Sequence, residues 1–218
     1  IKAEPREVIT GTLASLLSDR VVVTYDPRGT GRSSRTDGTR TLTPTEHAED
    51  IAAVIAELGV TRIDLFASSG GAVNALALLE KHPAIISTLV AHEPPLVSIV
   101  DDAPEALAAV HALSNLYQSS GFGAAMAAFI ALTSHRGPVP PAFGGAGSPD
   151  PAMFGLPTDD DGSRGDPLLG QNLLSCTTFE PNLAALRAAS TRIVVAVGEE
   201  SEGELADSAP PAPAALLD

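Results

Sequence analysis

The stretch LFASSGGAV, residues 65–73, marks an abrupt change in the chain. The apolar run Ile63–Phe66 stops at two serines, two glycines follow at once, and an alanine-rich helical pattern begins after them. Short apolar runs suit a buried strand, whereas the later spacing suits a helix. The stretch therefore predicts a strand that turns sharply into a helix, with a hydroxyl group at the turn.

Either serine could occupy the turn, and the flanking residues favour Ser69. A nucleophilic serine at such a junction has a strained backbone and needs small residues two positions away on each side. Ala67 and Gly71 flank Ser69 in this way, whereas Phe66 would crowd the turn around Ser68. We therefore predict Ser69 as the nucleophile. The plain alternative is a turn in which serine only caps the helix.

The backbone that follows Ser69 could serve the same chemistry. The first N–H groups of a helix have no partner within the helix and point toward its N-terminal end. Such groups stabilise the oxyanion that forms during acyl transfer. We expect the N–H of Gly70 to take this role.

The pattern around the turn indicates an α/β fold with a mostly parallel sheet. Helical segments alternate with apolar runs typical of buried parallel strands, and this alternation implies right-handed crossovers. The expected strands are VVVTYD (21–26), RIDLFA (62–67), 89–92 and RIVVAVG (192–198). Thr43, Pro44 and Glu46 form a strong helix start with a capping box, and Gly59 is expected to end that helix.

Residues 97–185 differ from this pattern and predict an insertion between two strands of the sheet. They contain two alanine-rich helical stretches, 104–118 and 122–133, and then a region rich in Pro and Gly over 137–167. We therefore expect a first part of the core over 1–96, a helical insertion over 97–185, and a continuation of the core over 186–218.

Composition excludes several classes of function. The net charge of −14 and the lack of a basic stripe argue against nucleic acid as a partner. No apolar run reaches the roughly 18 residues of a membrane span. Cys176, the single cysteine, cannot form an internal disulfide. We expect a cytoplasmic bacterial protein that acts on a small molecule, and the oligomeric state stays open.

No cofactor or metal is expected. The sequence has no HExxH and no clustered His and Asp with metal-ligand spacing. The segment GTGRSS lacks the lysine of a phosphate-binding loop, and ASSGG does not match GxGxxG.

A second motif gives the turn a family context. The segment DPRGTGRSS resembles the D-x-R-G-x-G-x-S segment of the α/β-hydrolase superfamily, carried here by Asp26, Arg28, Gly29, Gly31 and Ser33. The order of elements over 20–95 is similar to that family, and the insertion lies where the family carries its cap. The resemblance implies an α/β-hydrolase fold with a catalytic triad at a nucleophile elbow, while Asp26 and Arg28 are expected to hold their loop.

The resemblance leaves two positions open for the triad acid. Most members of the family place an Asp after the strand that follows the cap, where this chain has Ser201 beside Glu200. Some dehalogenases of the superfamily place the acid after the strand before the cap, where this chain has Glu93 in AHEPPL. We prefer Glu93, with Glu200 as the alternative. A solvated loop carboxylate is the plain interpretation of either residue.

The triad histidine is not found where the family supplies it, because no histidine follows His135. His47 is expected at the surface of its helix. His92 should point to the side of its strand opposite Glu93. We therefore name no catalytic histidine. We therefore expect a fragment that is incomplete at both ends, because this histidine and the early strands are missing and the first residue is Ile1.

The resemblance then implies a serine esterase that cleaves a small or medium apolar ester through an acyl-enzyme at Ser69. A cofactor-free haloperoxidase-like enzyme or a C–C bond hydrolase on the same fold is an alternative. A dehalogenase or epoxide hydrolase is disfavoured, because those enzymes carry Asp at the elbow. The alternative from another class is a pseudo-hydrolase that binds a ligand without catalysis.

Overall fold

The fold of the chain divides into two units, which a computed structural model describes over residues 15–38, 40–100, 103–140, 143 and 148–201. One unit extends to Thr36 and the other begins at Asp37. The larger unit contains a parallel sheet flanked by helices, as the sequence predicts for an α/β-hydrolase fold. Each unit is described by itself below.

The strand predicted over 21–26 is wrong. This segment of the smaller unit has no assigned strand, and Val21 and Val23 expose 91% and 51% of their surface. A β-branched run becomes a strand only where a neighbouring strand pairs with it, and no described strand pairs with this one. The loop after it is closed as expected, since the carboxylate of Asp26 accepts the backbone N–H of Arg32 at 2.9 Å.

The sheet of the larger unit has the order β1-β2-β3, with all neighbours parallel. The strands are β1 (Ile63–Ser68), β2 (Ile86–His92) and β3 (Arg192–Ala196). Their last residues lie side by side, because Ser68 pairs with His92 and His92 pairs with Ala196. The C-terminal ends of the three strands therefore form one common edge.

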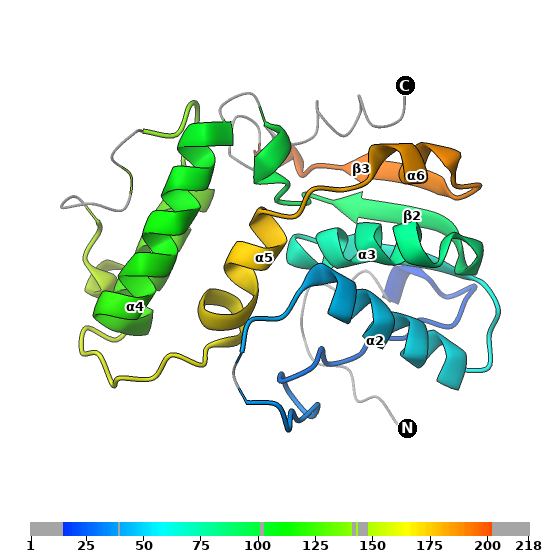
Figure 1. Cartoon of the computed structure of the whole chain (residues 1–218), viewed down its shortest axis with the longest axis horizontal. Coiled ribbons are helices and arrows are strands. Elements are labelled where there is room, and N and C mark those ends of the chain that lie inside the picture. Colours follow the sequence, from blue (N-terminus) through cyan, green and yellow to red (C-terminus); the bar gives the residue numbers. More distant parts are fainter. Residues whose placement is uncertain (1–14, 39, 101–102, 141–142, 144–147, 202–218) are drawn as a thin grey trace. The chain divides into compact units, whose positions relative to one another are not determined.

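Helix α3 (Gly70–Lys81) covers one face of this sheet, where it packs on β1 and β2, and α2 (Pro44–Glu57) packs on the outside of α3 (Figure 1). Their apolar side chains meet strand residues such as Leu89 in one buried core. Helix α6 (Leu183–Ala188) joins the same core through Leu186 before the chain enters β3.

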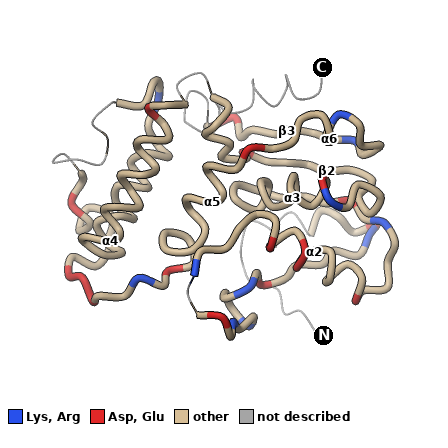
Figure 2. Tube along the Cα trace, viewed as in Figure 1, with Lys and Arg blue, Asp and Glu red and all other residues tan. Residues whose placement is uncertain are grey.

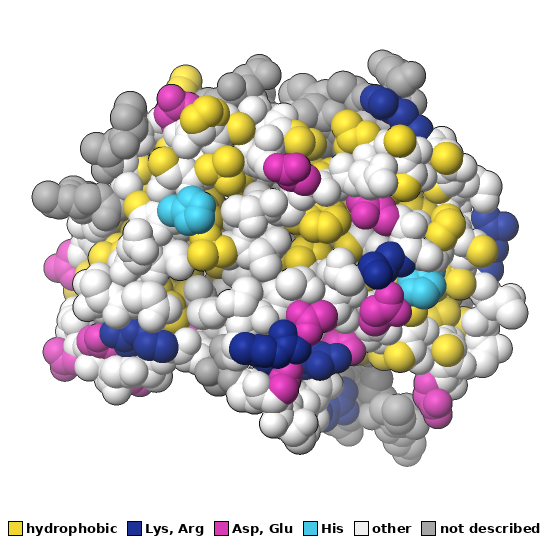
Figure 3. Space-filling model, viewed as in Figure 1, with side chains coloured by type: hydrophobic (Ala, Val, Ile, Leu, Met, Phe, Trp, Pro, Cys, Tyr) yellow, Lys and Arg dark blue, Asp and Glu magenta, His cyan; other side chains and the backbone are white. Residues whose placement is uncertain are grey.

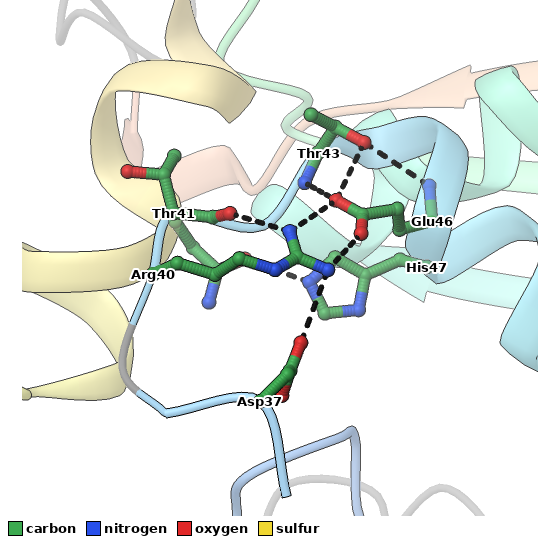
Figure 4. A network of polar contacts seen from close by, with 7 residues as sticks. Asp37, Arg40, Thr41, Thr43, Glu46 and His47 are labelled. Atoms are coloured by element: carbon green, nitrogen blue, oxygen red, sulfur yellow. Dashed lines mark hydrogen bonds and ion pairs between the residues drawn. The ribbon is translucent and has the colours of Figure 1, made fainter. Parts of the chain in front are cut away.

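The start of α2 follows the predicted capping box (Figure 4). The Thr43 hydroxyl accepts the N–H of Glu46 at 3.2 Å, and the Glu46 carboxylate accepts the N–H of Thr43 at 3.0 Å. The guanidinium of Arg40 also donates to this carboxylate and lowers the pKa of Glu46 to about 2. The helix ends as expected, with Gly59 at a φ of 68°.

Between β2 and β3 the chain forms helices with a second core of their own. The long α4 (Ala103–Thr133) is two helices joined at Gly121, whose φ of 79° and ψ of −170° interrupt them. This break separates the two helical stretches that the sequence predicts. Short helices follow at Pro151–Phe154, Pro167–Asn172 and α5 (Leu173–Thr177). Val110, Leu113, Tyr117 and Leu169 are among the buried side chains of this second core.

Charged side chains are sparse in α4 and of mixed sign elsewhere. In α4 the only Asp, Glu, Lys or Arg is Glu105, so its trace is almost free of charge in Figure 2. On the face shown in Figure 3, several Lys and Arg side chains lie beside Asp or Glu, and the described side chains on this face form no basic stripe. Among the described residues, no helix has both the length and the hydropathy that crossing a membrane requires.

Candidate active site

The predicted turn lies at the C-terminal edge of the sheet, between β1 and α3. Ser68 is the last residue of β1, and Ser69 follows with a φ of 54° and a ψ of −131°. A non-glycine residue in this region is strained and persists only where its surroundings enforce it. The N–H of Ser69 donates to the carbonyl of His92 at 2.8 Å, which extends the parallel ladder into the turn. The backbone thus places its turn at Ser69 rather than at Ser68.

The glycines after Ser69 begin the helix. The first intrahelical bond runs from the N–H of Ala72 to the carbonyl of Ser69 at 2.8 Å, so the N–H groups of Gly70 and Gly71 precede the helical ladder. The sequence argument that Gly71 must be small finds no steric support, because a Cβ built there has no described atom within 4 Å apart from its chain neighbours and the backbone of its own helix. The positive φ of Ser69, rather than crowding at Gly71, distinguishes the two serines.

A cavity of about 350 Å³ opens onto this turn, and Ser69, Gly70 and Glu93 lie in its wall. Most of the other lining side chains are apolar and come from the segment between β2 and β3. These are Pro95, Leu96, Val97, Val100, Val110, Leu113, Phe129, Leu132, Leu168 and Leu173, with Thr133, Asn172, Cys176 and Thr177 as the polar members. Ligand pockets typically span roughly 300 to 1,000 Å³, so the cavity suits a small molecule.

Three of the four polar members of this lining, Thr177, Thr133 and Asn172, form hydrogen bonds outside the cavity. The hydroxyl of Thr177 donates to the carbonyl of Leu173 at 2.7 Å, and that of Thr133 donates to Phe129 at 3.1 Å. Asn172 donates to the carbonyl of Pro167 and accepts from the ring of His47. The cavity therefore offers an apolar surface away from Ser69, Gly70 and Glu93.

Of the two candidate acids, Glu93 lies in the cavity wall and Glu200 does not. Glu93 follows β2 directly and has a φ of 47°. Its Oε1 accepts the N–H of Gly198 at 2.9 Å and the hydroxyl of Ser201 at 2.7 Å. Glu200 lies in the short helix Glu199–Ser201, where its carbonyl accepts a bond from Arg136.

The expectation that His92 points away from Glu93 is wrong. Its Nε2 lies 3.7 Å from Oε1 of Glu93, and its Nδ1 lies 3.0 Å from the hydroxyl of Ser68. Side chains alternate between faces only along an extended backbone, and the positive φ of Glu93 ends that alternation. The sequence gives no signal for this turn beyond the prolines that follow it.

The expectation that His47 lies at the surface is also wrong, because its side chain is only 3% exposed. Its Nε2 lies 2.7 Å from Oδ1 of Asn172, so the ring is buried against the segment before α5. A helical pattern read alone cannot show that a second segment covers the helix. Among the described residues, no histidine lines the cavity.

Cys176 is a free thiol in the cavity wall, close to the start of α3. Its Sγ lies 3.6 Å from the position of a Cβ built on Gly70. Burial raises the pKa of this thiol to about 11. Within the described ranges, no three His, Cys, Asp or Glu side chains are grouped so that they could hold a metal ion.

Comparisons with known proteins agree with this architecture. Residues 6–145 match the model of a family described as the alpha/beta hydrolase fold. Over 79 residues, 36% of this chain, the sequence is 33% identical to YraK, an uncharacterized hydrolase of Bacillus subtilis (strain 168). The matched part is 29% of YraK, so the chain spans less than a third of this curated relative.

Two solved structures are similar in fold. One comes from work on carboxylesterases of Nitrososphaera gargenis, with a TM-score of 0.52, 15% identity, and coverage of 87% of this chain and 66% of that one. The other is BpoC of Mycobacterium tuberculosis H37Rv, assigned as a non-heme bromoperoxidase, with a TM-score of 0.52 and 21% identity. The match covers 80% of this chain and 61% of the BpoC chain. At these identities the likeness concerns the fold.

Proposed function

Because this chain belongs to the alpha/beta hydrolase fold family, we propose that Ser69 is the nucleophile of a serine hydrolase that cleaves small or medium apolar carboxylic esters. The observation that carries the proposal is the strained turn at Ser69, which opens into an apolar cavity beside a carboxylate. A turn of this kind projects a hydroxyl from the sheet edge, and the adjoining helix supplies N–H donors.

The proposed reaction has two steps. The Oγ of Ser69 attacks the ester carbonyl carbon while its proton passes to a histidine base, and the N–H of Gly70 stabilises the oxyanion. The C–O bond to the alcohol then breaks, and the base returns the proton to the leaving alkoxide. Water hydrolyses the acyl-enzyme in the same way. Glu93 would orient the histidine, which the proposal requires and which none of the lining residues provides.

The substrate class follows from the cavity. Apolar side chains form most of the wall, and the hydroxyls of Thr133 and Thr177 already donate to their own helices. An acyl chain without polar groups loses no hydrogen bond to water when it enters such a cavity. The volume of about 350 Å³ favours a short or medium chain over a long one.

A fluorophosphonate probe on the full-length protein tests the nucleophile, and the neighbouring serine gives a matched control. We expect the probe to modify Ser69, as mapped by peptide mass spectrometry. We also expect Ser69→Ala to lose both the label and the hydrolysis of p-nitrophenyl butyrate. Ser68→Ala should keep both, because Ser68 ends β1 and does not line the cavity. Labelling at Ser68 would contradict the proposal, as would a protein with neither label nor hydrolysis.

A further inference from the structure

The carboxylate of Glu93 is held by the turn that follows β3, a segment more than a hundred positions further along the chain. The N–H of Gly198 and the hydroxyl of Ser201 both donate to Oε1, at 2.9 and 2.7 Å. We propose that Ser201 and Gly198 are positioning residues, which act on the reaction by fixing this carboxylate at the cavity. The inference rests on the proposed function, in which Glu93 is the triad acid.

The backbone of Glu93 first brings the side chain to this turn. Its N–H donates to the carbonyl of Ala196 at 2.9 Å, which extends the pairing of β2 with β3 by one residue. Its φ of 47° then turns the chain out of the strand. A strained conformation of this kind has to be enforced by surrounding contacts, and the bonds to the carboxylate supply them.

The turn after β3 presents its two donors to the same oxygen. The N–H of Ser201 donates to the carbonyl of Gly198 at 3.1 Å, and this bond closes the turn so that the Ser201 hydroxyl and the Gly198 N–H lie on one side. Donation by two groups favours the ionised form of a carboxylate. Together with His92, whose Nε2 lies 3.7 Å from the same oxygen, the two donors restrict the movement of Oε1.

The carboxylate oxygen of Glu93 leaves little room for a side chain at Gly198. A Cβ built on Gly198 would lie 3.2 Å from Oε1 of Glu93 and 3.4 Å from the hydroxyl of Ser201. A side chain at position 198 would therefore push the carboxylate away from its donors. Glu93 exposes 20% of its side chain and lies in the cavity wall with Ser69, so a displacement here changes the orientation that the acid offers to a base.

A titration that needs no turnover tests whether the donors fix the carboxylate. In the full-length protein with 13C-labelled glutamate carboxyls, Glu93→Gln identifies the Glu93 resonance. Ser201→Ala should raise its titration midpoint by about one pH unit, because a hydrogen bond to the ionised form is lost. Ser201→Thr should keep the midpoint. Ser98→Ala is the matched control, because that hydroxyl donates to Phe179 and not to Glu93.

Kinetics then test whether the donors act through Glu93. Ser201→Ala should lower kcat on p-nitrophenyl butyrate by roughly 10-fold with KM little changed, and Ser201→Thr should recover it. Gly198→Ala should lower kcat in the same way. In a Glu93→Ala background, Ser201→Ala should have no further effect, which a merely structural role would not produce.

An unmoved midpoint in Ser201→Ala would overturn the inference, as would an equal loss of kcat with and without Glu93. Failure of the proposed function is a separate result. A wild-type protein that neither hydrolyses esters nor reacts with the fluorophosphonate would overturn the function, while the titration would still decide whether Ser201 holds the carboxylate.

Discussion

Ser69 and Glu93 occupy matching places in the fold. Each directly follows a parallel strand, and each donates its N–H to the last residue of the next strand, His92 or Ala196. Among the described residues they are the only two non-glycine residues with a positive φ. The same backbone device therefore occurs twice along one sheet edge.

What enforces the two turns is different. After Ser69 a helix of 12 residues begins at once, and the Ser69 side chain forms no cap hydrogen bond with that helix, although Ser69 lines the cavity. After Glu93 come two prolines, and the side chain itself bonds to the turn beyond β3. The same strained backbone therefore accompanies a side chain with no cap bond at Ser69 and an anchored side chain at Glu93.

The largest expected difference between the two turns is in turnover. We expect Ser69→Ala to lower kcat/KM for p-nitrophenyl butyrate by about 10³-fold or more, because the acyl-enzyme cannot form. Glu93→Ala should lower it by about 10²-fold, since an unoriented base still works in part. Steady-state and stopped-flow assays measure both losses of kcat/KM, on variants whose circular dichroism spectra match that of the wild type. Equal losses of kcat/KM would show that catalysis depends on Glu93 as much as on Ser69. A fully active Glu93→Ala would show that Glu93 is not the triad acid.

A smaller expected effect is on the reactivity of Cys176, the side chain that lies next to the turn at Ser69 as Ser201 lies next to the turn at Glu93. Ser201 donates to Glu93, whereas Cys176 lies beside Gly70 with a pKa raised by burial to about 11. Only the thiolate reacts with maleimides, so at pH 7.5 we expect Cys176 to react on the order of 100-fold more slowly than a free cysteine. The rate should rise tenfold per pH unit up to about pH 10. The urea-unfolded protein is the control, and a fast reaction in the folded protein would show that the helix start lowers this pKa more than burial raises it.

A third effect uses the charge difference between the two residues. Glu93 is the only charged side chain among the described residues that line the cavity, and Ser69 is neutral. An ester whose acyl chain ends in a carboxylate should be cleaved at least about tenfold less efficiently than its methyl-capped counterpart, because that charge would be buried without a partner. Comparison of kcat/KM for the pair measures this. Equal values would place the acyl chain outside the cavity.

Local signals explain what the sequence could predict. The capping box of Thr43 and Glu46 involves only four residues, and both of its hydrogen bonds form as predicted. The alternation of apolar strands and helices likewise gave the parallel sheet, and Gly121 divides α4 where the helical pattern breaks. For the capping box and for the break in α4, the determining residues are close in sequence.

Long-range contacts explain what the sequence could not predict. His47 is buried against Asn172, to which its ring is hydrogen-bonded, and the carboxylate of Glu93 accepts hydrogen bonds from Gly198 and Ser201. In these cases the partners are more than a hundred positions apart. The strand prediction for 21–26 is wrong for a related reason, because a β-branched run does not specify whether a neighbouring strand will pair with it.

Glycine at the two turns tests, through stability, what enforces each turn. At Ser69 glycine should relieve about 1–3 kcal/mol of backbone strain against roughly 0.5–1 kcal/mol of added chain entropy, so Ser69→Gly should be about 1 kcal/mol more stable. At Glu93 the same relief is offset by two lost bonds to a carboxylate, each contributing about 1.5–3 kcal/mol, so Glu93→Gly should be less stable than the wild type. Urea denaturation at unchanged m-value measures both. If the two variants gained equally, the bonds from Gly198 and Ser201 would contribute nothing to stability, and the turn at Glu93 would be set by the backbone alone.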